Sequence, residues 1–136
     1  MKKPPKPTFR SFLLADLVFP QDTGKWCAIG IFDQINCRQF PAVHYSMGML
    51  IELSDGEGDY VVRVDVANAN EQVIASTAEV TALAKNRLEG FRVGIQTYGL
   101  ILPAPGKYFF KLYCNDDFVQ DYPLMARQYD AKEEAP

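Results

Sequence analysis

Alternation of apolar and polar residues with a period of two is the feature of this sequence that most restricts its fold. In residues 60–66 the even positions are apolar, whereas Arg63 and Asp65 point the other way. The even positions of residues 107–114 and the odd positions of residues 46–53 likewise share one face. Successive side chains point to opposite faces of a strand, so each segment predicts a strand with one buried side and one side that faces solvent or a partner.

Turn-forming residues separate these segments at short, regular intervals. Residues 54–58 and 115–117 are rich in Ser, Asn, Asp and Gly, which favours tight hairpins. The expected strands cover residues 11–19, 26–35, 43–53, 59–67, 72–80, 89–101, 107–114 and 118–126. Only residues 81–88 suggest a helical turn, or else a crossover loop. The pattern predicts an all-β fold, an antiparallel β-sandwich of about seven to eight strands, immunoglobulin-like or jelly-roll.

The length of 136 residues and the hydrophobic share of 48% suit one domain with a substantial core. We expect that domain to cover residues 11–129. Residues 1–10 contain three prolines, which lack an N–H group and fix φ, so they predict a flexible, extended and unpaired basic arm. Residues 130–136 are polar and predict a frayed acidic tail.

Charge is distributed unevenly along the chain. The net charge is −3, which argues against a nucleic-acid binder. Lys2, Lys3, Lys6 and Arg10 nevertheless lie within the first ten residues, and the remaining residues carry 10 positive and 17 negative charges. A positively charged arm on a negatively charged body favours contact between subunits, which predicts a homo-oligomer or a complex with another protein.

Compartment is inferred from the cysteines and from the lack of long apolar runs. No apolar segment approaches the roughly 18 residues of a membrane span, and no small-residue cleavage site follows the basic start, so we expect no membrane span. Cys27, Cys37 and Cys114 are an odd number without a CxxC motif, which favours reduced thiols in a cytoplasmic protein. One disulfide with one free thiol is the alternative.

The segment 23–35, Thr-Gly-Lys-Trp-Cys-Ala-Ile-Gly-Ile-Phe-Asp-Gln-Ile, follows Asp16 and resembles the opening of an uncharacterised family of small bacterial single-domain proteins. Segments 53–60 and 102–108 are similar to the same family. The resemblance implies a β-sandwich over most of residues 12–126. It implies no activity and transfers no functional residue, because the family has none assigned.

The residue inventory does not predict an enzyme. His44 is the only histidine, and no serine motif of the GxSxG type accompanies it, so a histidine in a loop or at a strand end is the preferred interpretation. Cys37, next to Arg38, is the one thiol whose surroundings suggest reactivity. The chain has no GxGxxG motif and no phosphate-binding loop of the Walker type. We therefore predict no catalytic residue, no cofactor and no metal centre.

Loop parity suggests one acidic rim. Alternate loops of an antiparallel sandwich lie at the same end, which groups the acidic residues of several turns: Asp22, Asp55, Glu57, Asp116 and Asp117. Such oxygens suit a hard cation such as calcium. The same end also collects Lys25, Lys85 and Arg87, and no DxDxDG motif is present. A solvated rim of turns is therefore the preferred interpretation.

Two strand faces are poor in charge and predict contact surfaces. The outward face of residues 89–101 carries Arg92, Gly94, Gln96 and Tyr98. Residues 43–53 likewise offer Ser46, Gly48 and Leu50 outward. Solvent faces usually carry more charge, and glycines let another backbone approach closely. We expect Arg92, Gln96 and Tyr98 to contact a partner.

Two classes of function follow from these patterns. The first is a non-catalytic structural or protein-interaction module that assembles with itself or with a partner. The second is a module that binds a small ligand, carbohydrate ahead of calcium, with Trp26, Tyr98 and Tyr113 as aromatic candidates. A β-sandwich alone does not decide between them, because the fold hosts many functions.

Overall fold

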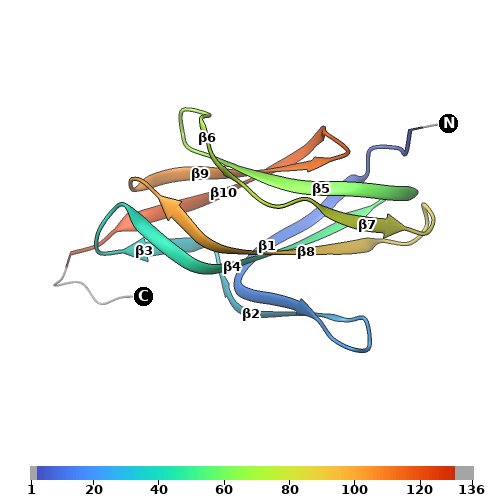
Figure 1. Ribbon diagram of the computed structural model, residues 1–136, viewed down its shortest axis with the longest axis horizontal. Coiled ribbons are helices and arrows are strands. Elements are labelled where there is room, and N and C mark those ends of the chain that lie inside the picture. The colour runs from blue at the N-terminus through green and yellow to red at the C-terminus, as the bar shows by residue number, and fades with distance from the viewer. Residues whose placement is uncertain (1–2, 131–136) are drawn as a thin grey trace.

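The computed structural model describes residues 3–130, which form strands and loops without a helix (Figure 1). The strands are β1 (Thr8–Pro20), β2 (Trp26–Phe32), β3 (Gln34–Cys37), β4 (Ala42–Ser54), β5 (Gly58–Ala67), β6 (Val73–Ser76), β7 (Val80–Ala84), β8 (Phe91–Leu102), β9 (Gly106–Cys114) and β10 (Asp117–Gln128). Nothing in the described residues is a helix of the length and hydrophobicity that crossing a membrane requires.

The strands form two sheets that face each other. The first has the order β2-β1-β4-β8 and is antiparallel throughout. The second has the order β3-β10-β9-β5-β6, with β7 also paired to β5, and its β3–β10 pair is parallel. Figure 1 shows the two layers, with β5, β9 and β10 above β4 and β8. The predicted all-β sandwich is confirmed.

Two expected elements differ in the structure. The segment predicted as one strand over residues 26–35 forms β2 in the first sheet and β3 in the second, with the crossing at Asp33. The helical turn expected within residues 81–88 is wrong, because Val80–Ala84 is strand β7 and pairs with β5. Pairing with β5 overrides the helical preference of the alanine and leucine residues in this segment.

The N-terminal segment departs from the expectation of an unpaired arm over residues 1–10. Strand β1 already begins at Thr8, and Pro7 is buried. The Tyr60 hydroxyl donates a hydrogen bond to the carbonyl of Pro5, and Lys3 Nζ lies 3.0 Å from Asp117 Oδ2. The prolines keep the segment extended, but it lies against its own domain. Lys2 and residues 131–136 of the predicted tail lie outside the described residues.

The hydrophobic core lies between the two sheets and uses the faces that the alternation predicts. Ten residues on the three faces defined by the alternation are all buried in the structure: Met47, Met49, Ile51, Tyr60, Val62, Val64, Val66, Tyr108, Phe110 and Leu112. Phe12 of β1 joins them and stacks on Tyr122 of β10, with ring centroids 4.8 Å apart. The core prediction is confirmed.

We predict that Phe110→Ala lowers the free energy of unfolding by about 3–5 kcal/mol, because it removes a fully buried ring and leaves a cavity. Phe118, which is half exposed, is the matched control, and we expect Phe118→Ala to cost less than about 1 kcal/mol. Urea unfolding of both variants measures the difference. Similar losses in the two variants would contradict the assignment of the core face.

Candidate functional site

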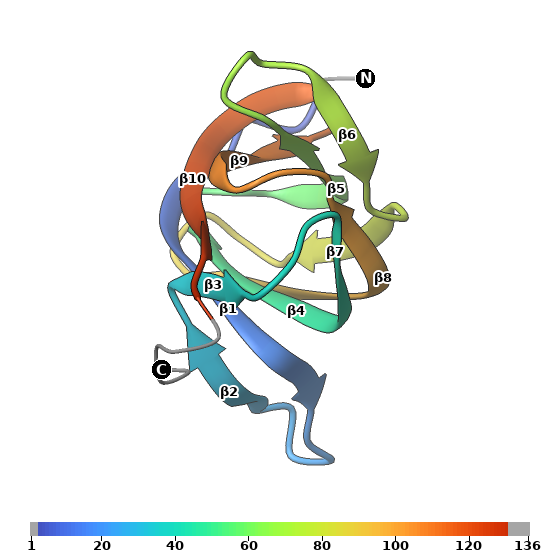
Figure 2. The same cartoon turned by 90° about the vertical axis from the view of Figure 1, so that its left-hand side faces the viewer.

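Strand β1 pairs with β4 for only part of its length. It pairs with β4 from Thr8 to Ala15 and then continues to Pro20 with β2 as its only partner. Residues 14–32, here called the hairpin, pass beneath β4 and β8 on the outer side of the sandwich (Figure 1). Figure 2 shows the hairpin projecting from the body at the bottom of the view. It therefore forms a partial third layer.

Two glycines make room for the hairpin on the outer face of the sheet. A Cβ atom on Gly48 would lie 2.8 Å from the backbone nitrogen of Val18. A Cβ atom on Gly94 would overlap the indole ring of Trp26. The close approach expected at these glycines therefore occurs within the same chain, with the Val18 backbone over Gly48 and the Trp26 ring over Gly94.

The Gln96 side chain holds the hairpin where β1 leaves β4. Its Oε1 accepts a hydrogen bond from the Val18 N–H at 3.0 Å, and its Nε2 donates to the Asp16 carbonyl at 3.0 Å. The Ser46 hydroxyl donates to the same carbonyl at 2.7 Å. The Gln96 amide therefore bonds to backbone groups that have no partner in a neighbouring strand. Val18 is buried, and a buried backbone N–H needs a hydrogen-bond partner.

The other side of the hairpin is apolar and faces away from the sandwich. Leu17, Ile29 and Ile31 are 38%, 56% and 64% exposed, and Leu17 pairs directly with Ile29. None of the seven residues of β2 is charged. Within the described residues β2 pairs only with β1, so its second edge is free. Edge strands usually carry charge or proline, and this one carries neither.

A small polar cluster lies where the hairpin joins the body. His44 Nε2 is 3.9 Å from Asp16 Oδ1, and both residues line a shallow pocket with Asn36 and Cys37. Burial lowers the pKa of His44 against the opposing charge of Asp16, and burial raises the pKa of the Cys37 thiol. The thiol and the imidazole are thus both held uncharged near neutral pH, which does not favour nucleophilic catalysis. Asn36 Oδ1 is buried and accepts no hydrogen bond from the described residues.

The cysteines are free thiols in the structure, so the alternative of one disulfide is not formed. Cys114 is buried in β9, and burial, together with the charge of Asp117, raises its pKa to about 11. Cys27 lies on the hairpin, where its sulfur accepts a hydrogen bond from the Gln21 amide at 2.8 Å.

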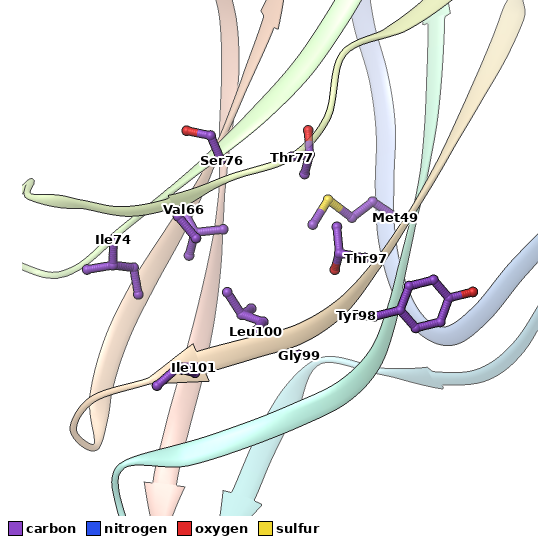
Figure 3. A pocket seen from close by; sticks show the side chains of 11 residues that line it. Met49, Val66, Ile74, Ser76, Thr77, Thr97, Tyr98, Gly99, Leu100 and Ile101 are labelled. Atoms are coloured by element: carbon purple, nitrogen blue, oxygen red, sulfur yellow. The ribbon is translucent and has the colours of Figure 1, made fainter.

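A cleft of about 250 Å³ opens between β6 and β8, where the edges of the two sheets face each other. Figure 3 shows Val66, Ile74 and Leu100 together on one side, and the ring of Tyr98 pointing away from them. The serine and threonine hydroxyls that line the cleft are hydrogen-bonded within the protein. Ser76 donates to Asp65 at 2.7 Å, Thr97 donates to the Met47 carbonyl at 3.2 Å, and Thr77 accepts from the Val64 N–H at 3.0 Å.

The acidic residues expected on one rim are mostly paired. The 54–58 and 115–117 segments lie at the same end, since Asn115 Oδ1 accepts a hydrogen bond from the Val61 N–H near the start of β5. Asp116 lies 2.7 Å from Arg63, and Asp117 is paired with Lys3. The Ser54 and Thr8 hydroxyls lower the pKa of Asp55 by hydrogen bonding.

The other two acidic residues of the predicted rim do not lie in the same turn. Glu57 belongs to the same end as Asp55, whereas Asp22 lies in the turn of the hairpin. Across the described chain, no three or more His, Cys, Asp or Glu side chains are grouped so as to hold a metal ion.

The other predicted contact residues are scattered. Arg92 is 3.2 Å from Glu52 on the neighbouring strand, and Arg10 donates to the Ser54 hydroxyl at 2.7 Å. Lys6 is exposed. Tyr98 is 73% exposed on β8.

The aromatic candidates for a sugar platform do not lie together. Tyr113 is on β9 in the other sheet, where Arg63 lies 4.4 Å above its ring. Trp26 is on the hairpin against Gly94. Sequence reasoning missed the hairpin surface, although the uncharged segment from Trp26 to Phe32 between Lys25 and Asp33 was a visible signal.

Comparison with known proteins supports the fold. A family model described as "Family of unknown function (DUF6941)" matches residues 10–127. No curated protein matches the chain. A β-glucosidase from Listeria innocua, solved with gluconolactone, has a TM-score of 0.50 at 12% sequence identity over 88% of this chain, which spans 16% of the enzyme. The alkylpurine DNA glycosylase AlkC from Pseudomonas fluorescens, bound to DNA containing an abasic site analog, has a TM-score of 0.45 at 12% identity, covering 85% of this chain and 30% of the glycosylase. The similarity to the β-glucosidase concerns the fold alone.

We predict that Gln96→Ala destabilises the protein by about 1–3 kcal/mol, because the Val18 N–H loses its partner and the Asp16 carbonyl loses one of its two donors. Gln120→Ala is the control, since the exposed Gln120 bonds only to the carbonyl of its neighbour Asp121. Chemical denaturation compares the two. A loss in Gln96→Ala no larger than that in Gln120→Ala would show that the amide does not hold the hairpin.

The lowered pKa of His44 predicts a pH dependence of stability. Below its ordinary pKa of about 6.5, the unfolded chain takes up a proton that the folded protein resists, so the free energy of unfolding falls as the pH falls from about 6.5 toward the folded pKa. We expect His44→Asn to lose less stability than the wild type between about pH 7.5 and pH 5.5. Urea unfolding at the two pH values measures this, and an equal loss in both proteins would contradict it.

Proposed function

The chain belongs to the family of unknown function DUF6941, and from its own geometry we propose that it is a non-catalytic protein-interaction module that binds through the hairpin. The observation that carries this proposal is the combination of an apolar face and a free, uncharged strand edge on the same element. Leu17, Ile29 and Ile31 supply that face. Contiguous exposed apolar surface is typical of sites that contact other proteins.

The hairpin is also mechanically suited to recognition. Gln96, Gly48 and Gly94 fix it to the sheet from one side, so its other side is presented on a firm support. A pre-ordered strand edge binds another strand at a lower entropic cost than a flexible loop does. Three cysteines without a CxxC motif favour a reducing compartment, and we propose on that ground that the module acts in the cytoplasm.

Binding of a small ligand is the second candidate, and the cleft between β6 and β8 favours it. A sugar would need hydroxyl and amide groups free to bond it, whereas the hydroxyls of Ser76 and Thr97 already donate to Asp65 and Met47. A calcium ion would need unpaired oxygens, whereas Asp116 and Asp117 face Arg63 and Lys3. The geometry therefore supports the interaction module better.

Site-specific cross-linking in the native cell tests the proposal. A photoreactive benzoylphenylalanine at Ile31 should yield adducts of defined mass, because this side chain lies on the binding face. Val73 is the matched control, since it is 57% exposed, against 64% for Ile31, and also lies on a strand with one paired edge. Equal adducts at the two positions, or none at Ile31, would contradict binding through the hairpin.

A further inference from the structure

We propose that the partner of the hairpin is a second copy of this chain, joined by antiparallel pairing of β2 with β2 about a two-fold axis at Ile29. This inference rests on the proposed function and names the occupant of the free edge. A two-fold contact uses the same surface on both subunits, so the surface has to be complementary to itself. Strand β2 meets that condition in its backbone, its side chains and its charges.

The backbone of β2 has its free groups in the right places. The Gln21 N–H donates to the Lys25 carbonyl at 2.7 Å, so Lys25 and every second residue after it direct their backbone groups toward β1. Trp26, Ala28 and Phe32 therefore direct theirs to the free edge. The pairs between β1 and β2 share one register from Leu14 to Pro20, with the Asp16–Gly30 pair absent, where Gly30 has a φ of 73°. A second strand therefore meets an edge whose residues on either side of Gly30 keep the same alternation.

The flanking charges select the register. Lys25 and Asp33 stand on either side of the uncharged segment, both are exposed, and neither forms an ion pair with another described residue. An antiparallel pair centred on Ile29 places Lys25 of each copy opposite Asp33 of the other. A register shifted by two residues would place Lys25 opposite Ile31. Opposite charges across an antiparallel pair are stabilising, so the centred register is favoured.

The same register joins the apolar faces. Ile29 meets Ile29 of the second copy, and Ile31 meets Cys27 of the second copy, on the side where Leu17 is also exposed. The two hairpins then form one four-stranded antiparallel layer. Its central strands carry no charge, which is the usual composition of strands that are paired on both edges. Ile29 thereby faces a second isoleucine, and Ile31 faces the uncharged Cys27.

A charge-swap experiment tests the pairing. In the proposed dimer, residue 25 of each copy faces residue 33 of the other. Lys25→Asp therefore places an acid opposite an acid at both positions, and Asp33→Lys places a base opposite a base at both. We expect each single variant to dimerise about tenfold more weakly than the wild type, or weaker still. An equimolar mixture of the two variants restores both opposite-charge pairs, so it should form a heterodimer of near wild-type strength. Sedimentation at low salt and tens of micromolar protein measures all of these masses.

Matched controls make the outcomes decisive. Lys85→Asp makes the same charge change in the loop after β7 and should leave the dimer unchanged. Ile29→Asp should abolish dimerisation, whereas Val73→Asp, at a residue of equal exposure, should not. Circular dichroism confirms that each variant is folded. A monomeric wild type, or a mixture no stronger than either single variant, would overturn the pairing.

Failure of this inference is distinguishable from failure of the proposed function. The protein could prove monomeric in solution while residue 31 cross-links to a different protein in the cell. That result would overturn pairing with a second copy but would leave the hairpin as the binding surface. Absence of any specific adduct at residue 31 would overturn the proposed function. An adduct with twice the mass of the chain would support both.

Discussion

The amide of Gln96 connects β8 to β1, two strands of one sheet that are not neighbours. The position of the hairpin on the outer face of that sheet depends on this connection. Strand β1 lies beside β4 up to Ala15 and then rises over Gly48, where Gln96 bonds to the Val18 N–H and the Asp16 carbonyl. Without Gln96, the departure of β1 would leave the N–H of the buried Val18 unpaired. With these hydrogen bonds, the hairpin forms a partial third layer outside the two sheets. One face of the hairpin then packs on the sheet, and its other face is exposed.

The two sheets deal with their polar groups in different ways. The outer face of the first sheet is short of charge because the hairpin covers part of it, and Trp26 fills the space above Gly94. The second sheet relies on side-chain pairs at one end, where Arg63 lies between Asp65 and Asp116 and over the ring of Tyr113. Those acids are therefore matched within the chain. The hairpin instead combines the exposed Leu17, Ile29 and Ile31 with two flanking charges that have no ion-pair partner among the described residues, and this combination directs attention to β2.

Sequence patterns predicted the faces of the strands better than they predicted their neighbours. The period of two reports which side chains are buried, and it placed Tyr60 and Phe110 correctly in the core. It does not report which sheet a strand joins, so the crossing at Asp33, between β2 and β3, was invisible to it. The pairing of β7 was missed for a related reason, because contact with β5 decides the conformation of a segment with weak local preference. Gly48 correctly predicted a close approach of another backbone, but which backbone approaches depends on tertiary structure. The free edge of β2 could not be predicted for the same reason, because it depends on which strands pair in the folded protein.

Hydrogen exchange at the backbone of β2, followed as a function of protein concentration, tests most directly whether this edge is used. The account predicts that the amides of Ala28 and Phe32, which point away from β1, exchange rapidly in dilute protein and become protected as the concentration rises. The amides of Cys27 and Ile31, already bonded toward β1, should change little, and so should the edge of β6. Rapid exchange at Ala28 and Phe32 at every concentration, or a gain of protection spread evenly over the whole sandwich, would contradict an interface formed by β2.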